Sequence, residues 1–559
     1  MPFSRQNPTA RIMLRPAFTF ILAIVVGALG GWVFWRLAER MLGVVPAPLA
    51  HEAQLPGANS AHVADDGGTP SLRLSAAELA QVATWMEQLN DAHARTHEAV
   101  LTFSSADGLQ RFVARASPGL AVVARLDPLR ALRVRFAERS DIERELAAHP
   151  GEFEDAAANL VMQLPDPPTK VDRDMTGTIP VGSRLWETLG VETDPSQWGR
   201  GVTIAIVDTG VTPDPTFGTG RLRTLDLGLG ISGKTEGDGH ATAVASLAAG
   251  ASRDAPGVAP AATILSIRVT DESGLSDTFT VAQAIVAAVD QGAQIVNISL
   301  GAHQSGWVLN SAINYAANRG VLLVAAAGND QAAQLEWPAA DPRVVSVGAV
   351  DAVGNQLIFS NAGPQLQLTA PGLGLLTAWT EGSRVWFDGT SASAPIVAGA
   401  IAALMTQSPG LTAIQARDIL RQYSSDGGRE GVDPDYGAGI VNLGWAMARN
   451  DPARVDTAVS SHYYDPVSDS MQFVIQNRSA RGVGGSTLAI DVDGSQSEVS
   501  IPWIDAGATR TISVPAHAVE LPADQQRHFH TELRNAPGTI DVVPTNNVRT
   551  SSLSGLHRG

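Results

Sequence analysis

The chain has 559 residues, enough for about three or four domains of ordinary size. Its formal net charge of −17 at pH 7 argues against a nucleic-acid partner, because contacts with phosphates depend on clustered Lys and Arg side chains. The absence of cysteine excludes disulfides, thiolate nucleophiles and cysteine-based zinc sites, although it does not exclude an oxidising compartment.

The N-terminus predicts a membrane anchor. Residues 1–15 contain three arginines, and an uncharged run from Pro16 to Trp35 follows that is about as long as a bilayer span. Signal peptides have a shorter apolar core of about 7–15 residues and a small-residue cleavage site, so we expect an uncleaved anchor at 16–36. The positive flank predicts a cytoplasmic N-terminus and an extracytoplasmic location, periplasmic or extracellular, for the rest of the chain. Arg36 and Arg40 weaken that bias, but a cleaved signal would also export the chain.

Two linkers and a small domain come next. Residues 37–75 include a stretch rich in Ala, Pro and Gly and are expected to form a flexible linker. Residues 76–165 have a strand, helix, strand, strand, helix, strand pattern that predicts a compact α+β domain. The predicted elements are 99–103, 105–116, 120–125, 130–136, 140–149 and 159–164. A second linker is expected at 166–181.

In residues 182–450 apolar strands alternate with helices of small residues. This alternation predicts a doubly wound, mostly parallel α/β sheet, whose ligands lie outside the carboxyl ends of the strands. The predicted strands are 202–207, 262–269, 294–300 and 321–327, and helices begin near His240, Asp277 and Trp307, with C-caps expected at Gly292 and Gly320.

The final segment, residues 451–559, changes to short alternating strands with Gly and Asn turns. This pattern predicts an antiparallel β-sandwich. The predicted strands are 471–477, 486–492, 509–514 and 539–543.

Three polar residues that could take part in catalysis lie at the end of a predicted strand or the start of a predicted helix in the α/β domain. Asp208 ends the strand VTIAIV, Asn329 follows LVAAAG, and His240 begins a helix of very small residues. Taken singly, each has a structural interpretation as a turn residue, cap or packed side chain. The VDTG sequence around Asp208 is also similar to the signature of aspartic peptidases, but those folds are all-β and the chain has no second DTG.

The segment DGTSASAPIVAG contains three hydroxyl groups, and each could be either structural or catalytic. Thr390, Ser391 and Ser393 stand at or near the start of a predicted helix, where Ser and Thr are common caps. One of them could instead be a nucleophile. The segment alone leaves both interpretations open.

The motifs together resemble one family. VDTG, GDGHATAVAS, IVNISLG, LVAAAGND and DGTSASAPIVAG occur in this order, and over residues 182–450 the chain closely resembles the subtilisin-like serine peptidases (subtilases). The resemblance implies a triad of Asp208, His240 and Ser391, with Asn329 as the oxyanion-hole residue and Thr390 and Ser393 as framework. Asp208 would orient His240, and His240 would take the proton of Ser391. All of these groups are oxygen or nitrogen, so no cofactor is required.

The resemblance also implies substrate contacts. One segment matches the edge to which an extended peptide adds as a strand, and a second matches the other wall of the primary specificity pocket. These segments are Ser299, Leu300 and Gly301, and Ala326, Ala327 and Gly328. Asp330 stands at the rim of that pocket and is expected to favour a basic substrate residue weakly. The chain lacks the longer loop after LAAGASRD that builds a common calcium site in the family, so no metal is expected there.

The flanking domains have resemblances of their own. Residues 76–165 resemble the inhibitor-like prodomains of subtilases, which predicts a zymogen whose own prodomain blocks the cleft until the linker at 166–181 is cut. The alternative is a permanently attached domain. Residues 451–559 resemble, more weakly, the CARDB-type adhesion modules of bacterial exported proteins.

The sequence therefore predicts a membrane-anchored, self-processed serine endopeptidase that acts on extended segments of proteins. The alternative is a non-catalytic binding scaffold that uses the subtilase groove and the C-terminal sandwich to hold partners.

Overall fold

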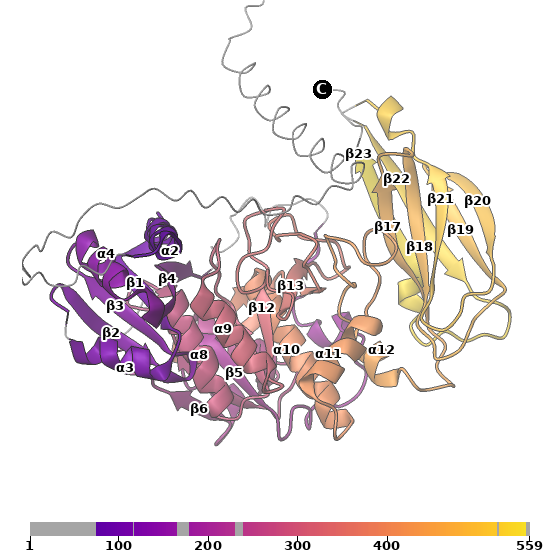
Figure 1. Ribbon diagram of the computed structural model, residues 1–559. Helices are drawn as coiled ribbons and strands as arrows, with labels where there is room; N and C mark the ends of the chain where they lie inside the picture. The colour runs from indigo at the N-terminus through magenta and orange to yellow at the C-terminus, as the bar shows by residue number, and fades with distance from the viewer. Residues whose placement is uncertain (1–73, 116, 165–177, 230–238, 523–524, 555–559) are drawn as a thin grey trace, which may run out of the picture. The chain divides into compact units, whose positions relative to one another are not determined.

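The computed structural model describes residues 74–115, 117–164, 178–229, 239–522 and 525–554 (Figure 1). The predicted anchor at 16–36 and nearly all of the two predicted linkers lie outside these ranges. Within the described ranges, no helix has both the length and the apolar character needed to cross a membrane.

The N-terminal domain (residues 74–164, indigo in Figure 1) has the predicted α+β pattern. Its strands form the order β4-β1-β3-β2, β10 (Leu275–Asp277) of the central domain adds to the sheet beside β4, and all neighbouring strands are antiparallel. The elements are α2 (Ala76–Gln88), β1 (Ala94–Phe103), α3 (Ala106–Arg115), β2 (Leu120–Leu126), β3 (Ala131–Phe136), α4 (Arg139–Ala148) and β4 (Phe153–Gln163). Helix α2 was not expected from the sequence, although the Ser75 and Glu78 capping box at its start is a recognisable signal.

The central domain (residues 178–450) contains a seven-stranded sheet of order β14-β13-β12-β11-β5-β9-β6. Every pair of neighbours is parallel, which confirms the predicted doubly wound sheet. Its strands are β5 (Thr203–Asp208), β6 (Leu222–Leu225), β9 (Thr263–Arg268), β11 (Ile295–Ile298), β12 (Leu322–Ala326), β13 (Val345–Val350) and β14 (Leu368–Pro371). Shorter strands are β7 (Ala251–Ser252), β8 (Ala255–Pro256), β10 (Leu275–Asp277), β15 (Leu375–Ala378) and β16 (Arg384–Phe387).

Helices cover both faces of this sheet. They are α6 (Leu185–Thr188), α7 (His240–Ala249), α8 (Thr278–Asp290), α9 (Trp307–Ala317), α10 (Thr390–Gln407), α11 (Ala413–Gln422) and α12 (Leu443–Ala448). The two faces of the sheet belong to two hydrophobic cores, as strand β5 shows. Ile204 and Ile206 pack in one core with α7 and α10, whereas Ala205 and Val207 pack in the other with α8 and α9. This alternation has the period of two that a strand buried on both faces requires.

The predicted helix ends at Gly292 and Gly320 are confirmed. Gly292 has φ 78° and donates to the carbonyl of Val289, while Ala293 donates to Ala288. These are the two hydrogen bonds of a Schellman motif, in which glycine adopts the left-handed conformation at low cost. Gly320 has φ 71° and ends α9 in the same manner.

The C-terminal domain (residues 451–554) is the predicted sandwich of two antiparallel sheets, of order β17-β18-β21 and β20-β19-β22-β23. Its strands are β17 (Thr457–Asp465), β18 (Ser470–Asn477), β19 (Ser486–Val492), β20 (Ser495–Ile501), β21 (Thr509–Pro515), β22 (Gln526–Arg534) and β23 (Val548–Ser554). The predicted strand at 539–543 is wrong, because this segment is a loop. Its Asp541 carboxylate accepts hydrogen bonds from Thr457, Asn535 and Asn547, so these side-chain contacts fix the loop in place of a strand ladder.

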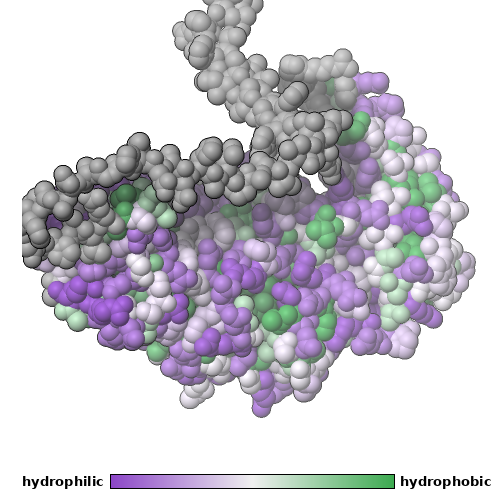
Figure 2. Space-filling view, viewed as in Figure 1, coloured by the Kyte–Doolittle hydropathy of each residue, from purple (hydrophilic) through white to green (hydrophobic). Residues whose placement is uncertain are grey.

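The visible described surface is mostly hydrophilic, and its hydrophobic residues form small separate groups (Figure 2). On this face, the described residues therefore expose no single large apolar patch.

Candidate active site

Asp208 and His240 form a buried pair at the carboxyl end of the central sheet. Asp208 is the last residue of β5 and His240 is the first residue of α7. The Nδ1 atom of His240 lies 2.9 Å from Oδ1 and 3.0 Å from Oδ2 of the carboxylate. A ring nitrogen that faces a carboxylate carries the proton, so Nε2 is left as the acceptor. The pair thus has the arrangement of a general base and the acid that orients it.

Close packing holds the imidazole in place. All ten residues of α7 are buried, and the ring of Phe387 lies edge-on to the His240 ring with centroids 5.2 Å apart. Gly239 precedes the histidine, and a Cβ added there would lie 1.9 Å from the Trp379 ring. Glycine is therefore required at that position, and the small residues of the helix allow the close approach.

The segment that begins α10 contains three hydroxyls, and two of them have structural hydrogen bonds. Thr390 Oγ1 donates to Asn329 Oδ1 at 2.9 Å, and Ser393 Oγ donates to the carbonyls of Ala370 and Pro371. These contacts agree with the framework role expected for both residues. Ser391 is different: it is only 2% exposed, and its Oγ has no hydrogen-bond partner among the described residues.

Of the two hydrogen bonds expected in the triad, the one between Asp208 and His240 is therefore formed. Within the described part of the chain, the Ser391 hydroxyl makes no hydrogen bond to His240. The two residues belong to adjoining elements, because Phe387, which packs on the His240 ring, lies four positions before Ser391. A buried hydroxyl without a partner is unfavourable unless another role offsets the cost.

Asn329 follows β12 and is oriented by α10. Its Oδ1 accepts from the backbone N–H of Thr390 at 3.0 Å as well as from the Thr390 hydroxyl. A Cβ added at Gly389 would lie 2.9 Å from Asn329 Nδ2, and Gly389 has φ 112°. The amide N–H₂ group thus lies beside the N-terminal end of α10, where the helix dipole also favours negative charge.

The two predicted substrate segments lie at the carboxyl ends of neighbouring strands, β11 and β12. The side chains of Ser299 and Leu300 are buried, as are Ala326 and Ala327. Gly301 exchanges two backbone hydrogen bonds with Gln163 at the end of β4, with distances of 2.9 and 3.0 Å. The edge predicted to bind an extended peptide is therefore already paired with the end of the N-terminal domain.

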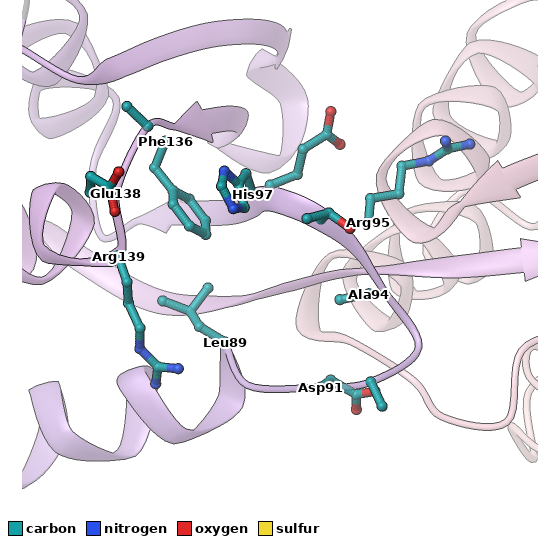
Figure 3. A pocket seen from close by; sticks show the side chains of 12 residues that line it. Leu89, Asp91, Ala94, Arg95, His97, Phe136, Glu138 and Arg139 are labelled. Atoms are coloured by element: carbon teal, nitrogen blue, oxygen red, sulfur yellow. The ribbon is translucent and has the colours of Figure 1, made fainter.

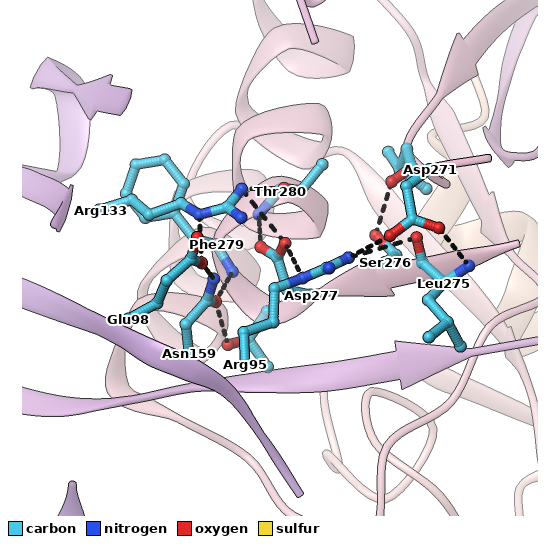
Figure 4. A network of polar contacts seen from close by, with 12 residues as sticks. Arg95, Glu98, Arg133, Asn159, Asp271, Leu275, Ser276, Asp277, Phe279 and Thr280 are labelled. Carbon is cyan, nitrogen blue, oxygen red and sulfur yellow. Dashed lines mark hydrogen bonds and ion pairs between the residues drawn. The ribbon is translucent and has the colours of Figure 1, made fainter. Parts of the chain in front are cut away.

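The N-terminal domain also contacts the start of α8 through ion pairs (Figure 4). Asp277 caps this helix by accepting from the N–H of Thr280, and its other oxygen accepts from Arg95 Nε at 2.9 Å. Arg133 lies 3.2 Å from the same carboxylate. Two cations from one domain therefore converge on one buried carboxylate of the other.

Glu98 completes this network. It receives a hydrogen bond of 2.7 Å from Arg133 and one of 3.1 Å from Asn159, whose Oδ1 in turn accepts from the N–H of Phe279 in α8. Burial acts to raise the pKa of Glu98, but the hydrogen bonds from Arg133 and Asn159 outweigh it and hold the pKa below its usual value.

A pocket of about 390 Å³ lies in the N-terminal domain. Its lining includes Leu89, Arg95, His97 and Phe136 (Figure 3). None of the candidate catalytic residues contributes to it, so this pocket is separate from the chemistry described above.

Comparison with known proteins identifies the central domain. The Subtilase family model matches residues 199–439. Subtilisin Savinase of Lederbergia lenta is 32% identical over 254 residues, which cover 44% of this chain and 90% of that protein. Subtilisin DY of Bacillus licheniformis is 31% identical over 275 residues, which cover 48% of this chain and 97% of that protein.

Solved structures extend the likeness in fold. Fervidolysin from Fervidobacterium pennivorans, described as a keratinolytic enzyme related to subtilisin, has a TM-score of 0.55 at 20% identity, covering 84% of this chain and 77% of that one. The epidermin leader peptide processing serine protease of Staphylococcus aureus has a TM-score of 0.52 at 20% identity, covering 63% and 98%. The sequence matches and the shared fold lead to one conclusion: the chain belongs to the subtilase family of serine peptidases.

Proposed function

We propose that this protein is a serine endopeptidase with Ser391 as nucleophile, His240 as general base, Asp208 as its orienting acid and Asn329 as oxyanion donor. The observation that carries the proposal is the contrast within α10. Thr390 and Ser393 make structural hydrogen bonds, whereas the buried hydroxyl of Ser391 has no hydrogen-bond partner within the part of the chain that the structure describes.

Rotation of the Ser391 side chain toward His240 Nε2 would complete the row of three groups. His240 would then take the hydroxyl proton while Oγ forms a bond to the substrate carbonyl carbon, and the imidazolium would be stabilised by Asp208. The developing oxyanion would receive hydrogen bonds from Asn329 Nδ2 and from the Ser391 backbone N–H. His240 would next protonate the leaving amine, and a water molecule would release the acyl group by the same steps in reverse.

The substrate is proposed to be an extended segment of a protein. The pairing of Gly301 with Gln163 supports this, because it shows that the edge after β11 can hold an added strand. Recognition through the backbone would tolerate many sequences, so the side-chain pockets would supply the preference.

We also propose that the N-terminal domain is an intramolecular inhibitor. Its strand β4 pairs with β10 and with Gly301, so it covers the proposed substrate edge. Cleavage within the linker at 166–181 would convert the zymogen into an active enzyme and detach it from the anchor proposed at 16–36. The extracytoplasmic location, periplasmic or extracellular, is proposed from the N-terminal sequence alone.

Fluorophosphonate labelling tests the function. Once the linker at 166–181 has been cut, the purified protein should take up the probe. Ser391→Ala should abolish labelling and Ser393→Ala should retain it, because Ser393 lies on the same helix but bonds to backbone carbonyls. A wild-type protein that never labels would support the alternative of a non-catalytic scaffold.

A further inference from the structure

The side chain of one buried glutamate, Glu336, lies between the two predicted walls of the primary pocket, with its carboxylate beside Gly301 and its Cγ beside Gly328. A Cβ built on Gly301 would lie 1.5 Å from Glu336 Oε2, and a Cβ built on Gly328 would lie 3.0 Å from Glu336 Cγ. Glu336 itself is 7% exposed. Glycine at 301 is required for the carboxylate to occupy this place, since any side chain there would overlap it.

The backbone fixes Glu336 between the two walls. Its N–H donates to the carbonyl of Ala327 at 3.1 Å, on one side. On the other side the next residue, Trp337, exchanges two hydrogen bonds with Ala302, of 2.8 and 3.0 Å. The backbone at Glu336 is therefore held between one wall segment, at Ala327, and the residue that follows the other, Ala302.

Asp330, the acid that the sequence placed at the rim of this pocket, has a different environment. It is exposed, and its contact in this region is a backbone hydrogen bond from its N–H to Asn361 Oδ1. Solvent and salt screen an exposed carboxylate strongly, whereas a carboxylate in a less polar surrounding acts on a neighbouring charge with greater energy. Of the two acids, Glu336 is therefore better placed to select a substrate side chain.

We infer that Glu336 makes the primary specificity pocket select a basic residue, Lys or Arg, immediately before the cleaved bond. This inference rests on the proposed function, because it assigns the substrate class of the same site. The aliphatic stem of a basic side chain would pack between the backbone walls while its cation meets the carboxylate. An acidic residue would be repelled, and an aromatic residue would have to displace the carboxylate.

A set of fluorogenic peptides that differ only in the residue before the cleaved bond tests the inference. We expect kcat/KM for Lys or Arg to exceed that for Gln by about tenfold or more, the size of a charge-assisted hydrogen bond. In Glu336→Gln the Lys-to-Gln ratio should fall by about tenfold. The ratio of two substrates does not depend on how much of the variant is folded.

Asp330→Asn is the matched control, and it should change the same ratio by less than about threefold because the carboxylate is exposed. A wild-type enzyme that cleaves the Gln or Phe peptide as well as the Lys peptide overturns the inference, even if Glu336→Gln cannot be purified. So does a Glu336→Gln variant with an unchanged ratio. A protein that cleaves no peptide and takes up no fluorophosphonate contradicts the proposed function itself, so the two failures are distinguishable.

Discussion

The N-terminal and C-terminal domains both contact the central domain, but through different kinds of interface. Five apolar residues of the N-terminal domain belong to the same hydrophobic core as α8 and α9. They are Val100, Leu126, Leu129, Ala131 and Met162. Each flanking domain also has a hydrophobic core of its own. Among the described residues, however, the core of the C-terminal sandwich includes no residue of the central domain, and its contacts with that domain include buried hydrogen bonds.

The polar contacts of the sandwich converge on the segment after α11. Asp426 donates its N–H to Gln476, and its carbonyl accepts from Ser460. Ser461 donates to the carbonyl of Gly428. Arg478 is buried behind them and donates to both Gln476 and Ser460.

The two kinds of interface suit different roles. A shared apolar core binds the N-terminal domain firmly over the proposed substrate edge, which suits a domain that must block the site until the chain is cut. Separate cores joined by hydrogen bonds suit a module that folds by itself and stays attached.

The largest effect is expected from Arg133→Met at the N-terminal interface. This change leaves Glu98 and Asp277 buried with one cation fewer, and removing one partner of a buried ion pair costs about 3–5 kcal/mol. Urea unfolding of the whole chain measures the loss. Arg135→Met is the control, because Arg135 contacts the same Glu98 but is 61% exposed and should cost less than about 1 kcal/mol. Equal losses in the two variants would contradict the account.

Arg478→Met should have a smaller effect, because Arg478 lies within the sandwich and holds Gln476 and Ser460, which contact Asp426 of the central domain. The variant loses the hydrogen bonds to Gln476 and Ser460, at a cost of about 1–3 kcal/mol. Because the sandwich has its own core, calorimetry should show two unfolding transitions, and the substitution should lower the transition of the sandwich more than the other. A single transition, shifted as a whole, would show that the sandwich does not unfold independently.

The two interfaces should respond to pH in opposite directions. Burial raises the pKa of Asp426 to about 7, so the folded state binds its proton more tightly than the unfolded state does. The stability of the C-terminal interface is then greatest at low pH and falls as pH rises from about 4 to about 7. Asp426→Asn should remove this fall, as thermal unfolding across that range would show. An identical pH profile in both proteins would exclude the effect.

Glu98 affects the pH dependence of stability in the opposite direction, because its pKa is held below the usual value. Its contribution to the N-terminal interface is present above the unfolded pKa and is lost as pH falls through the lower, folded pKa. Acidification should therefore weaken the N-terminal interface under conditions that strengthen the C-terminal one.

The smallest effect is expected for Glu430→Gln. The Glu430 side chain is exposed and accepts hydrogen bonds from Thr509 and Thr511 across the C-terminal interface. Exposed polar contacts of this kind usually change stability by less than about 0.5 kcal/mol. If calorimetry showed a loss of stability as large as that of Arg478→Met, the exposed contacts of Glu430, and not the buried hydrogen bonds, would hold the sandwich in place.

Much of this architecture could be predicted from local sequence patterns. The period of two in β5 and the glycines after α8 and α9 identify the parallel sheet, and the strand ends predict where polar groups gather. The pattern TIDVV at 539–543 wrongly predicts a strand, because the Asp541 carboxylate within it accepts hydrogen bonds from Thr457 and Asn547. Helix α2 was missed although its capping box is local.

Contacts between residues far apart in the chain could not be predicted in this way. No periodicity shows that Glu336 lies over Gly301, or that Arg95 and Arg133 meet Asp277. The motif of α10 predicts hydroxyls at a helix start but not their partners, and the partners are what separate Ser391 from Thr390 and Ser393.

The central claim is that Ser391 is the nucleophile that His240 and Asp208 activate. Mass-spectrometric mapping of the fluorophosphonate adduct on the purified protein tests it most directly. The account predicts one modified residue, Ser391, and no adduct there in His240→Ala. An adduct on another residue, or undiminished modification of Ser391 without His240, would contradict it.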